Sequence, residues 1–210
     1  MPDKGNPNTR IRIYESIKAE VRSGAYSPGQ PISPAMLAKH LSVSAIPIRE
    51  ALQRLVGERL VEMRQDHNGF LAPLVSEAGL RDLYQAQLVM LLWILEHGTL
   101  ARLQSVKPPR AQDAAPGLAA IEALFAELAD RAGSREMQWS LHNAIDRLHP
   151  VCLMKQEVAD DWISACERLL EQWQRGDLTA FKDALLDYHR RRVELVPALV
   201  ERINLPRTMH

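Results

Sequence analysis

The chain has 210 residues, 46% of them hydrophobic, and its 26 Lys and Arg are balanced by 26 Asp and Glu. This length allows two small domains, each able to bury a core. The longest apolar run, Leu88–Leu95, is too short to span a membrane, and the N-terminus lacks the apolar segment of a secretory signal. We therefore expect a cytoplasmic protein without a membrane partner, in which Cys152 and Cys166 are reduced thiols.

Charge is distributed unevenly along the chain. A net charge of zero argues at first against a nucleic-acid partner. Residues 1–75, however, hold ten Lys and Arg against seven Asp and Glu, whereas residues 76–210 hold sixteen against nineteen. The first segment is therefore positive, which is the sign that suits a surface facing phosphate.

The first predicted element is an amphipathic helix that follows a short tail. Residues 1–9 are typical of a disordered tail. Apolar Ile13, Ile17 and Val21 then recur at helical spacing, and a turn sequence begins near Ser23-Gly24.

Residues 37–55 predict two short helices joined by a tight turn. Ser33 can cap the first helix, with Pro34 at its first position. Ser42-Val43-Ser44 forms the turn, and Ser44 can accept a hydrogen bond from a free N–H of the second helix. Pro47 is tolerated there because it falls in the first helical turn.

The second of these helices has one apolar and one polar side. Arg49, Gln53 and Arg54 project away from the apolar side, which is formed by Ile48, Ala51, Leu52 and Leu55. One side can pack while the other touches phosphates and base edges. By itself, the pattern fits a helix-turn-helix or another pair of short helices in an all-α protein.

A hairpin follows the helix pair. Residues 60–64 and 70–74 are extended candidates, and Asn68-Gly69 between them is a typical hairpin turn. Three helices followed by a hairpin describe a winged helix-turn-helix.

The rest of the chain predicts helices without strands. Ser76 caps a long helix that runs to about Leu103, and residues 107–117 form a loop. The expected fold class is mainly α, with a winged helix-turn-helix domain over residues 1–75 and an antiparallel all-α bundle over residues 76–210. The other helices expected in the bundle are 118–131, 135–148 (stopping at Pro150), 156–175 (ending at Gly176), and a helix capped by Asp177 that reaches toward Ile203 despite Pro197.

The first 75 residues carry a family resemblance. SGAYSPGQPIS, LAKHLSVSAIPIREALQRLVGERLVE and HNGFLAPL, in this order, resemble the DNA-binding domain of GntR-family transcriptional regulators. Ala45 departs from the family pattern, because an arginine that contacts DNA usually stands there, and Pro34 replaces a usual acidic residue. The resemblance implies that double-stranded operator DNA is bound by Ser33, Ser44, Arg49, Arg54, Arg64, His67, Asn68 and Gly69.

The bundle resembles, by layout and a few positions, the FCD effector domain of the FadR subfamily. That domain binds small carboxylates, often through a metal held by an Asp and three His. Here Gln138 stands at the Asp position, His142 at the first His, Cys166 near the second, and Tyr188 or His189 at the third. A neutral amide is a poor ligand for a divalent cation. We therefore expect no cofactor, with zinc or a similar metal on His142, Cys166 and His189 as the alternative.

The implied effector pocket also departs from the family. The first FCD helix usually offers an arginine to the ligand carboxylate and a glutamate four residues later, where this chain has Gln87 and Leu91. A bidentate grip on a carboxylate is then lost, which suggests a less acidic effector or a bundle that only dimerises. The implied effector-binding residues are Tyr84, Gln87, Gln138, His142, Cys166 and His189.

These features favour a homodimeric repressor whose operator binding responds to a small-molecule effector. One small reader makes few base contacts, and a two-fold dimer doubles them. The alternative is a metal-free regulator whose bundle serves only dimerisation or protein interaction, and a winged helix can also bind protein. We do not expect an enzyme, because the chain has no nucleophile elbow and no Gly-rich phosphate loop; His142, Asp146 and His149 on one helix are its weak catalytic candidate.

Overall fold

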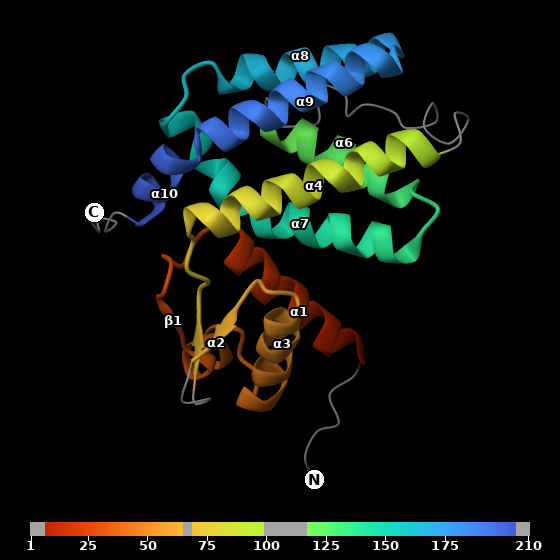
Figure 1. Ribbon diagram of the computed structural model, residues 1–210. Helices are drawn as coiled ribbons and strands as arrows, with labels where there is room; N and C mark the ends of the chain where they lie inside the picture. The colour runs from red at the N-terminus through yellow and green to blue at the C-terminus, as the bar shows by residue number, and fades with distance from the viewer. Residues whose placement is uncertain (1–6, 65–68, 99–116, 205–210) are drawn as a thin grey trace. The chain divides into compact units, whose positions relative to one another are not determined.

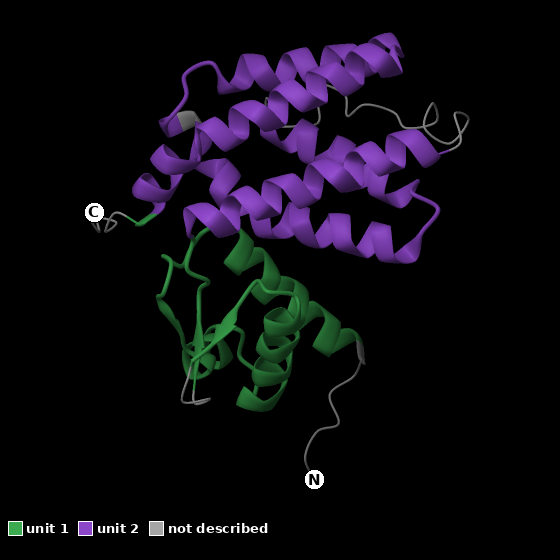
Figure 2. Cartoon of the chain, in the orientation of Figure 1, with its two compact units in different colours: residues 1–75, 204–210 green, residues 76–203 purple. Residues whose placement is uncertain are grey.

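The computed structural model describes residues 7–64, 69–98 and 117–204 (Figure 1). The chain divides into two compact units: residues 1–75 with 204–210, and residues 76–203 (Figure 2). None of the described helices is both long and apolar enough to cross a membrane.

The first unit consists of three helices and a small sheet. Its helices are α1 (Pro7–Arg22), α2 (Pro34–His40) and α3 (Ala45–Gly57). The strands β1 (Pro31–Ile32), β2 (Glu62–Met63) and β3 (Phe70–Leu71) form an antiparallel sheet in the order β1-β3-β2. This is the predicted winged helix-turn-helix with one additional strand, β1. That strand was not predicted because it has only two residues, one of them proline.

The chemistry expected of the caps is confirmed in part. The Ser33 hydroxyl accepts a hydrogen bond from the Met36 N–H at 3.3 Å and caps α2. Ser44 is the N-cap of α3, but its side chain makes no capping bond, contrary to our expectation. The tail prediction was too long, because α1 begins at Pro7; proline suits the first helical position, where its missing N–H would have no partner.

A polar cluster joins α1 to the end of α3. The buried Tyr14 hydroxyl donates to the Glu58 carboxylate, with O···O distances of 2.7 and 2.8 Å. Arg54 Nε lies 3.2 Å and Lys18 Nζ 3.5 Å from the same carboxylate. We name Tyr14, Lys18, Arg54 and Glu58 the Glu58 cluster. It holds the two helices together beside an apolar core that includes Ile17, Ile48, Leu52 and Leu55.

The second unit is an all-α bundle over its described residues. The helices are α4 (Glu77–His97), α6 (Leu118–Asp130), α7 (Arg135–Leu153), α8 (Trp162–Arg175), α9 (Leu178–Glu194) and α10 (Val196–Asn204), with a short 3-10 turn, η1 (Lys155–Glu157). Figure 1 shows α8 and α9 side by side, with α4, α6 and α7 completing the bundle. The predicted fold class is confirmed.

Several predicted helix ends were wrong. The α4 helix ends at His97, and residues 99–103 lie outside the described residues. The predicted loop 107–117 lies outside them as well, except for Gly117.

At two prolines of the bundle the helices differ from the prediction. The α7 helix continues through Pro150 to Leu153, since Val151 and Cys152 beyond the proline are buried. The cost of a proline inside a helix, about 3 kcal/mol, is offset by that burial. The expected last helix is two helices, with Pro197 in the first turn of α10.

The bundle core is apolar and largely aromatic at its centre. Trp162 and Trp173 are buried in it, with Phe125 and Tyr188. Trp139 on α7, in contrast, is 57% exposed.

Two glycines offer a matched test of the helix ends. Gly176 ends α8 at φ +73°, and a Cβ there would meet nothing within 4 Å. Gly176→Ala should therefore lower the free energy of unfolding only by the cost of placing alanine in a left-handed conformation, about 1 kcal/mol. Gly57 lies in α3 with equal space but without a positive φ. We expect Gly57→Ala to be neutral or stabilising by up to about 1 kcal/mol. Urea denaturation measures both, and a stabilising Gly176→Ala would contradict the argument.

Candidate nucleic-acid interface and effector site

The N-terminal half of α3 presents the free side chains of the first unit. Arg49 is exposed and makes no hydrogen bond or ion pair with any part of the chain that the structure describes. Ala45 and Arg49, four residues apart, lie on one face of the helix. Ile46 beside them is 66% exposed, and Ser44 is exposed at the start of the helix. This surface, Ser44, Ala45, Ile46 and Arg49, is named the reading surface.

Two other residues predicted to contact DNA have structural roles. Ser33 caps α2. The Arg54 guanidinium bonds Glu58 and lies 3.7 Å from the centroid of the Tyr14 ring, where it joins the Glu58 cluster. The structure therefore does not group Arg54 with the reading surface.

The hairpin brings Arg64 and Gly69 together. The Arg64 N–H donates to the Gly69 carbonyl oxygen at 3.0 Å and pairs the two ends of the hairpin loop. A Cβ on Gly69 would lie 2.8 Å from Arg64 Cδ, so glycine leaves room for that side chain. His67 and Asn68 lie outside the described residues.

The bundle contains two buried cations. Arg192 on α9 is 2% exposed, and Lys155 on η1 is fully buried. Arg192 Nη1 donates to Gln87 Oε1 on α4 at 2.5 Å and lies 3.2 Å from His189 Nε2. The guanidinium stacks on the Tyr84 ring at 4.0 Å from its centroid, and the Lys155 ammonium lies 4.1 Å from that of Trp162. We name Arg192 and Lys155 the buried cation pair.

No carboxylate neutralises this pair. Neither cation forms an ion pair with an Asp or Glu in the part of the chain that the structure describes. Arg192 Nε and Trp162 Nε1 are buried N–H donors without a hydrogen-bond acceptor. Buried charge without a partner is costly, and these donors and charges together suit an anion.

The pKa shifts around the pair follow from burial and from Arg192. Burial, and then the Arg192 charge, hold the pKa of His189 well below its usual range, so this imidazole is neutral. The same two causes lower the pKa of Lys155 to about 8. Burial raises the pKa of Cys166 to about 12, so this residue is a thiol at neutral pH.

The predicted effector residues fall into separate places. Tyr84, Gln87 and His189 surround Arg192. Gln138 Nε2 and His142 Nε2, in contrast, both lie 2.8 Å from Asp130 Oδ1. These last contacts are exposed to solvent, so the structure does not bring Gln138 and His142 into the buried site.

The metal set implied by the resemblance is not assembled either. Within the described ranges, no group of three or more His, Cys, Asp or Glu could hold a metal ion. His189 Nδ1 bonds the Leu185 carbonyl oxygen at 3.0 Å and its Nε2 faces Arg192, so both ring nitrogens are engaged. Since His142 bonds Asp130, the residues His142, Cys166 and His189 do not fit a shared metal.

Sequence reasoning missed both cations. We had concluded from Gln87 that the bundle lacks a guanidinium at this place, but Arg192 from α9 supplies one against the Gln87 side chain. The conclusion was wrong because it considered only the helix that carries the arginine in the family. Arg192, three residues after His189, lies one turn away on the same helix, and this spacing was the available signal.

Among the hollows lined by described residues of the bundle, three bear on the site. One of about 10 Å³, enough for a single water-sized molecule, is lined by Gln87, Phe125, Cys152, Tyr188 and Arg192 among others. A groove of about 440 Å³ between α4 and α9 reaches Tyr84 and His189.

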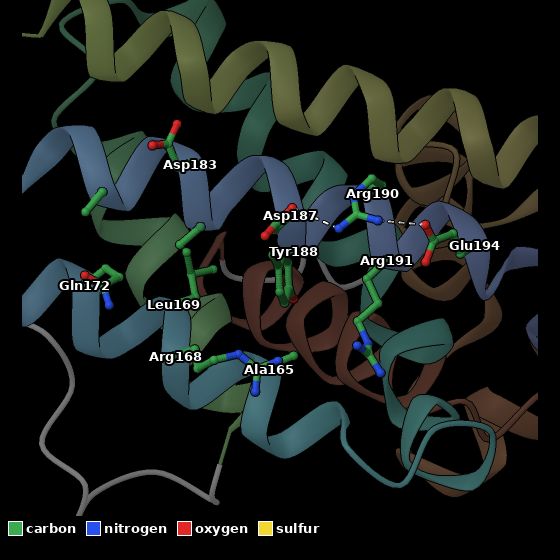
Figure 3. Close-up of a pocket in the computed structure, with 12 residues that line it drawn as sticks. Ala165, Arg168, Leu169, Gln172, Asp183, Asp187, Tyr188, Arg190, Arg191 and Glu194 are labelled. Carbon is green, nitrogen blue, oxygen red and sulfur yellow. Dashed lines mark hydrogen bonds and ion pairs between the residues drawn. The ribbon is translucent and has the colours of Figure 1, made fainter.

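The third hollow is a groove of about 490 Å³ between α8 and α9 (Figure 3). Arg190 at its edge bonds Asp187 at 3.0 Å and Glu194 at 3.2 Å, and Arg191 bonds Asp161. The groove between α4 and α9 is the better route to Arg192, because it reaches Tyr84 and His189, which both contact that guanidinium.

A winged helix-turn-helix with a free arginine on its second helix, joined to a helical unit, defines a DNA-binding regulatory protein. Residues 9–70 match the family model described as bacterial regulatory proteins, gntR family. This match covers most of the first unit, which over these residues is similar to regulators of the GntR family.

Known proteins are similar over different lengths. The chain is 30% identical over 78 residues to the HTH-type transcriptional regulator YdhC of Bacillus subtilis, covering 37% of this chain and about a third (34%) of that protein. It is 28% identical over 191 residues to the galactonate operon transcriptional repressor of Escherichia coli, covering 81% and 79%. A crystal structure of a putative GntR regulator from Rhodococcus sp. RHA1 has a TM-score of 0.69 at 18% identity, covering 91% and 98%, and shares the fold.

The buried lysine makes stability depend on pH. In the folded chain the pKa of Lys155 is about 8, against the ordinary 10.5, so between these values the folded state has lost a proton that the unfolded state keeps. Between pH 8 and 10.5 this group therefore raises the free energy of unfolding by about 3 kcal/mol. This gain in stability is lost again as the pH falls from 10.5 to 8.

We expect Lys155→Met to remove this dependence. The variant should exceed the unaltered chain in stability most at pH 7, with the difference shrinking toward pH 10.5. Urea denaturation of both proteins across this range measures the difference, so that other titrating groups cancel. A difference that does not change with pH would contradict the burial argument.

Proposed function

We propose that the chain is a transcriptional repressor that binds a near-palindromic operator as a homodimer in the cytoplasm and is controlled by a small anionic effector in its bundle. The observation that carries DNA binding is the free guanidinium of Arg49 on the reading surface. The galactonate operon relative is named a repressor, which supports this direction of control.

The reading surface has the chemistry of direct base readout. An arginine on a helix in the major groove can donate two hydrogen bonds to guanine O6 and N7. Ala45, on the same face, offers a methyl group that suits the methyl of thymine. One such surface reads few bases, and a dimer reads two half-sites at a fixed spacing.

Arg49→Ala should remove sequence discrimination. We expect a loss of about 1–3 kcal/mol in the preference for the operator over a scrambled duplex of equal length, because a guanine contact disappears. Arg12→Ala is the matched control, since Arg12 is an exposed arginine on α1. It should weaken both duplexes alike or neither. Fluorescence anisotropy at fixed salt measures both, and an equal loss of discrimination in the two variants would contradict the role of Arg49.

The effector proposal rests on the buried cation pair. A carboxylate, or another small anion, would accept from the Arg192 guanidinium and neutralise charge that is buried without a counterion. The second unit then serves as an FCD-type effector domain, with Tyr84, Gln87 and His189 placed around the ligand. The 10 Å³ hollow is too small for such a molecule, so binding requires the groove between α4 and α9 to deepen.

Control follows if the effector prefers one placement of the two readers. A ligand shifts an equilibrium only by its difference in affinity for the two states. We propose that the anion favours an arrangement in which the two reading surfaces no longer match successive major-groove faces. The proposal gives no role to a metal, since within the described residues no group of three or more His, Cys, Asp or Glu could hold one.

Arg192→Met should keep the fold and lose the ligand. Replacing an unpaired buried charge by an apolar side chain is neutral or stabilising, so the variant should melt at the same temperature or higher without ligand. In the unaltered chain, an effector at a hundred times its dissociation constant adds about 2.7 kcal/mol of stability. We expect this increment to disappear in Arg192→Met.

The control is Arg175→Met, an exposed arginine at the end of α8 that lines neither groove, which should keep the increment. Thermal unfolding with a panel of small carboxylates, galactonate included, gives the readout, and anisotropy shows whether the bound ligand releases operator DNA. Stabilisation that survives in Arg192→Met would place the effector elsewhere. If no anion in the panel binds, the alternative of a bundle that only dimerises gains support.

A further inference from the structure

Cys152 on α7 lies between the two buried cations. Lys155 Nζ donates to Cys152 Sγ at 3.2 Å, and Arg192 Nη2 lies 4.0 Å from the same sulfur. Cys152 is 4% exposed and Lys155 is fully buried. The sulfur is thus the group that both cations share.

The sulfur of Cys152 lies in cationic surroundings. An arginine stays protonated in a protein, so Arg192 places a fixed positive charge in an apolar core. Burial raises the pKa of Tyr84 and Tyr188, which keeps both neutral. Both cations contact the Cys152 sulfur. An ammonium bonded to sulfur, with a guanidinium beside it, is an environment that stabilises a thiolate, the nucleophilic form of cysteine.

A small molecule has room beside this sulfur. Cys152 and Arg192 both line the hollow of about 10 Å³, which has the size of one small molecule such as water. Arg192 Nε is buried there without an acceptor. The hollow therefore places a site for a small polar molecule against the sulfur.

We propose that Cys152 is an oxidant-reactive residue at which hydrogen peroxide forms a sulfenic acid. The thiolate sulfur attacks one peroxide oxygen, an S–O bond forms and the O–O bond breaks. The leaving hydroxide takes a proton from the Lys155 ammonium and becomes water. Sulfur is oxidised by two electrons and the peroxide is reduced by two.

The same structure makes Cys166 the unreactive control. Cys166 is also fully buried, but no cation bonds its sulfur, and its raised pKa keeps it a thiol. Burial alone therefore does not separate the two cysteines, whereas contact with the cation pair does. This inference is independent of DNA binding. It shares Arg192 with the proposed effector site, but its readout, oxidation of one cysteine, does not require an effector to bind.

The test measures sulfenic acid on each cysteine of the folded full-length chain. The folded protein is treated with hydrogen peroxide at neutral pH, the peroxide is removed with catalase, and the chain is then unfolded in dimedone so that the reagent reaches both sulfurs. Peptide mass spectrometry, repeated over a series of peroxide exposure times, gives the labelling rate at each site. We expect label on Cys152, at least tenfold faster than on Cys166. Cys166→Ser should keep the label and Cys152→Ser should lose it.

Lys155 supplies the second readout. Lys155→Met should slow labelling of Cys152 at least tenfold, and Lys155→Gln serves if the first variant does not fold. In denaturant the two cysteines should react alike, which shows that the selectivity belongs to the fold. Equal labelling in the folded chain, label on neither cysteine, or an unchanged rate without the ammonium would each overturn the proposal.

Discussion

The bundle keeps a guanidinium in its core, and the electrostatics of the site follow from it. Arg192 is held by the Gln87 carbonyl oxygen, by the face of Tyr84 and by the neighbouring imidazole of His189, and none of these carries negative charge. An amide oxygen and a π-face reduce the cost of burying the charge without cancelling it. The lowered pKa of Lys155 and the neutral state of His189 are consequences of this one arginine together with burial. The core therefore holds two buried cations that no carboxylate of the described chain neutralises, and an anion bound there would stabilise it.

The winged helix-turn-helix could be predicted from the sequence because its signals are local. Ser33 and Pro34 mark the start of one helix, and apolar positions at helical spacing from Ile48 mark the next. Each feature lies within a few residues of the element it defines. The strand Pro31–Ile32 was missed because its pairing with Phe70–Leu71 is distant in the chain and nothing local announces it.

The bundle site could not be predicted in the same way. Gln87, Lys155 and Arg192 come from α4, η1 and α9, and their proximity depends on how the helices pack. A resemblance to a family pattern pointed to the correct surroundings through Tyr84, Gln87 and His189, and to a wrong partner set through His142, which bonds Asp130 instead. Pro150 misled for a related reason, since a local stop signal yields where the residues beyond it are needed in the core.

Because of the Glu58 cluster, the two halves of α3 have different roles. The second half of α3 is committed to folding, because Arg54 and the neighbouring Glu58 fasten Tyr14 of α1. In the first half Ile48 packs in the core, but Ala45, Ile46 and Arg49 project into solvent. Substitutions at these three exposed positions can thus change which bases are preferred with little cost in stability, whereas substitutions at Arg54 cannot. A protein built in this way can acquire a new operator by changing a few side chains on an unaltered scaffold.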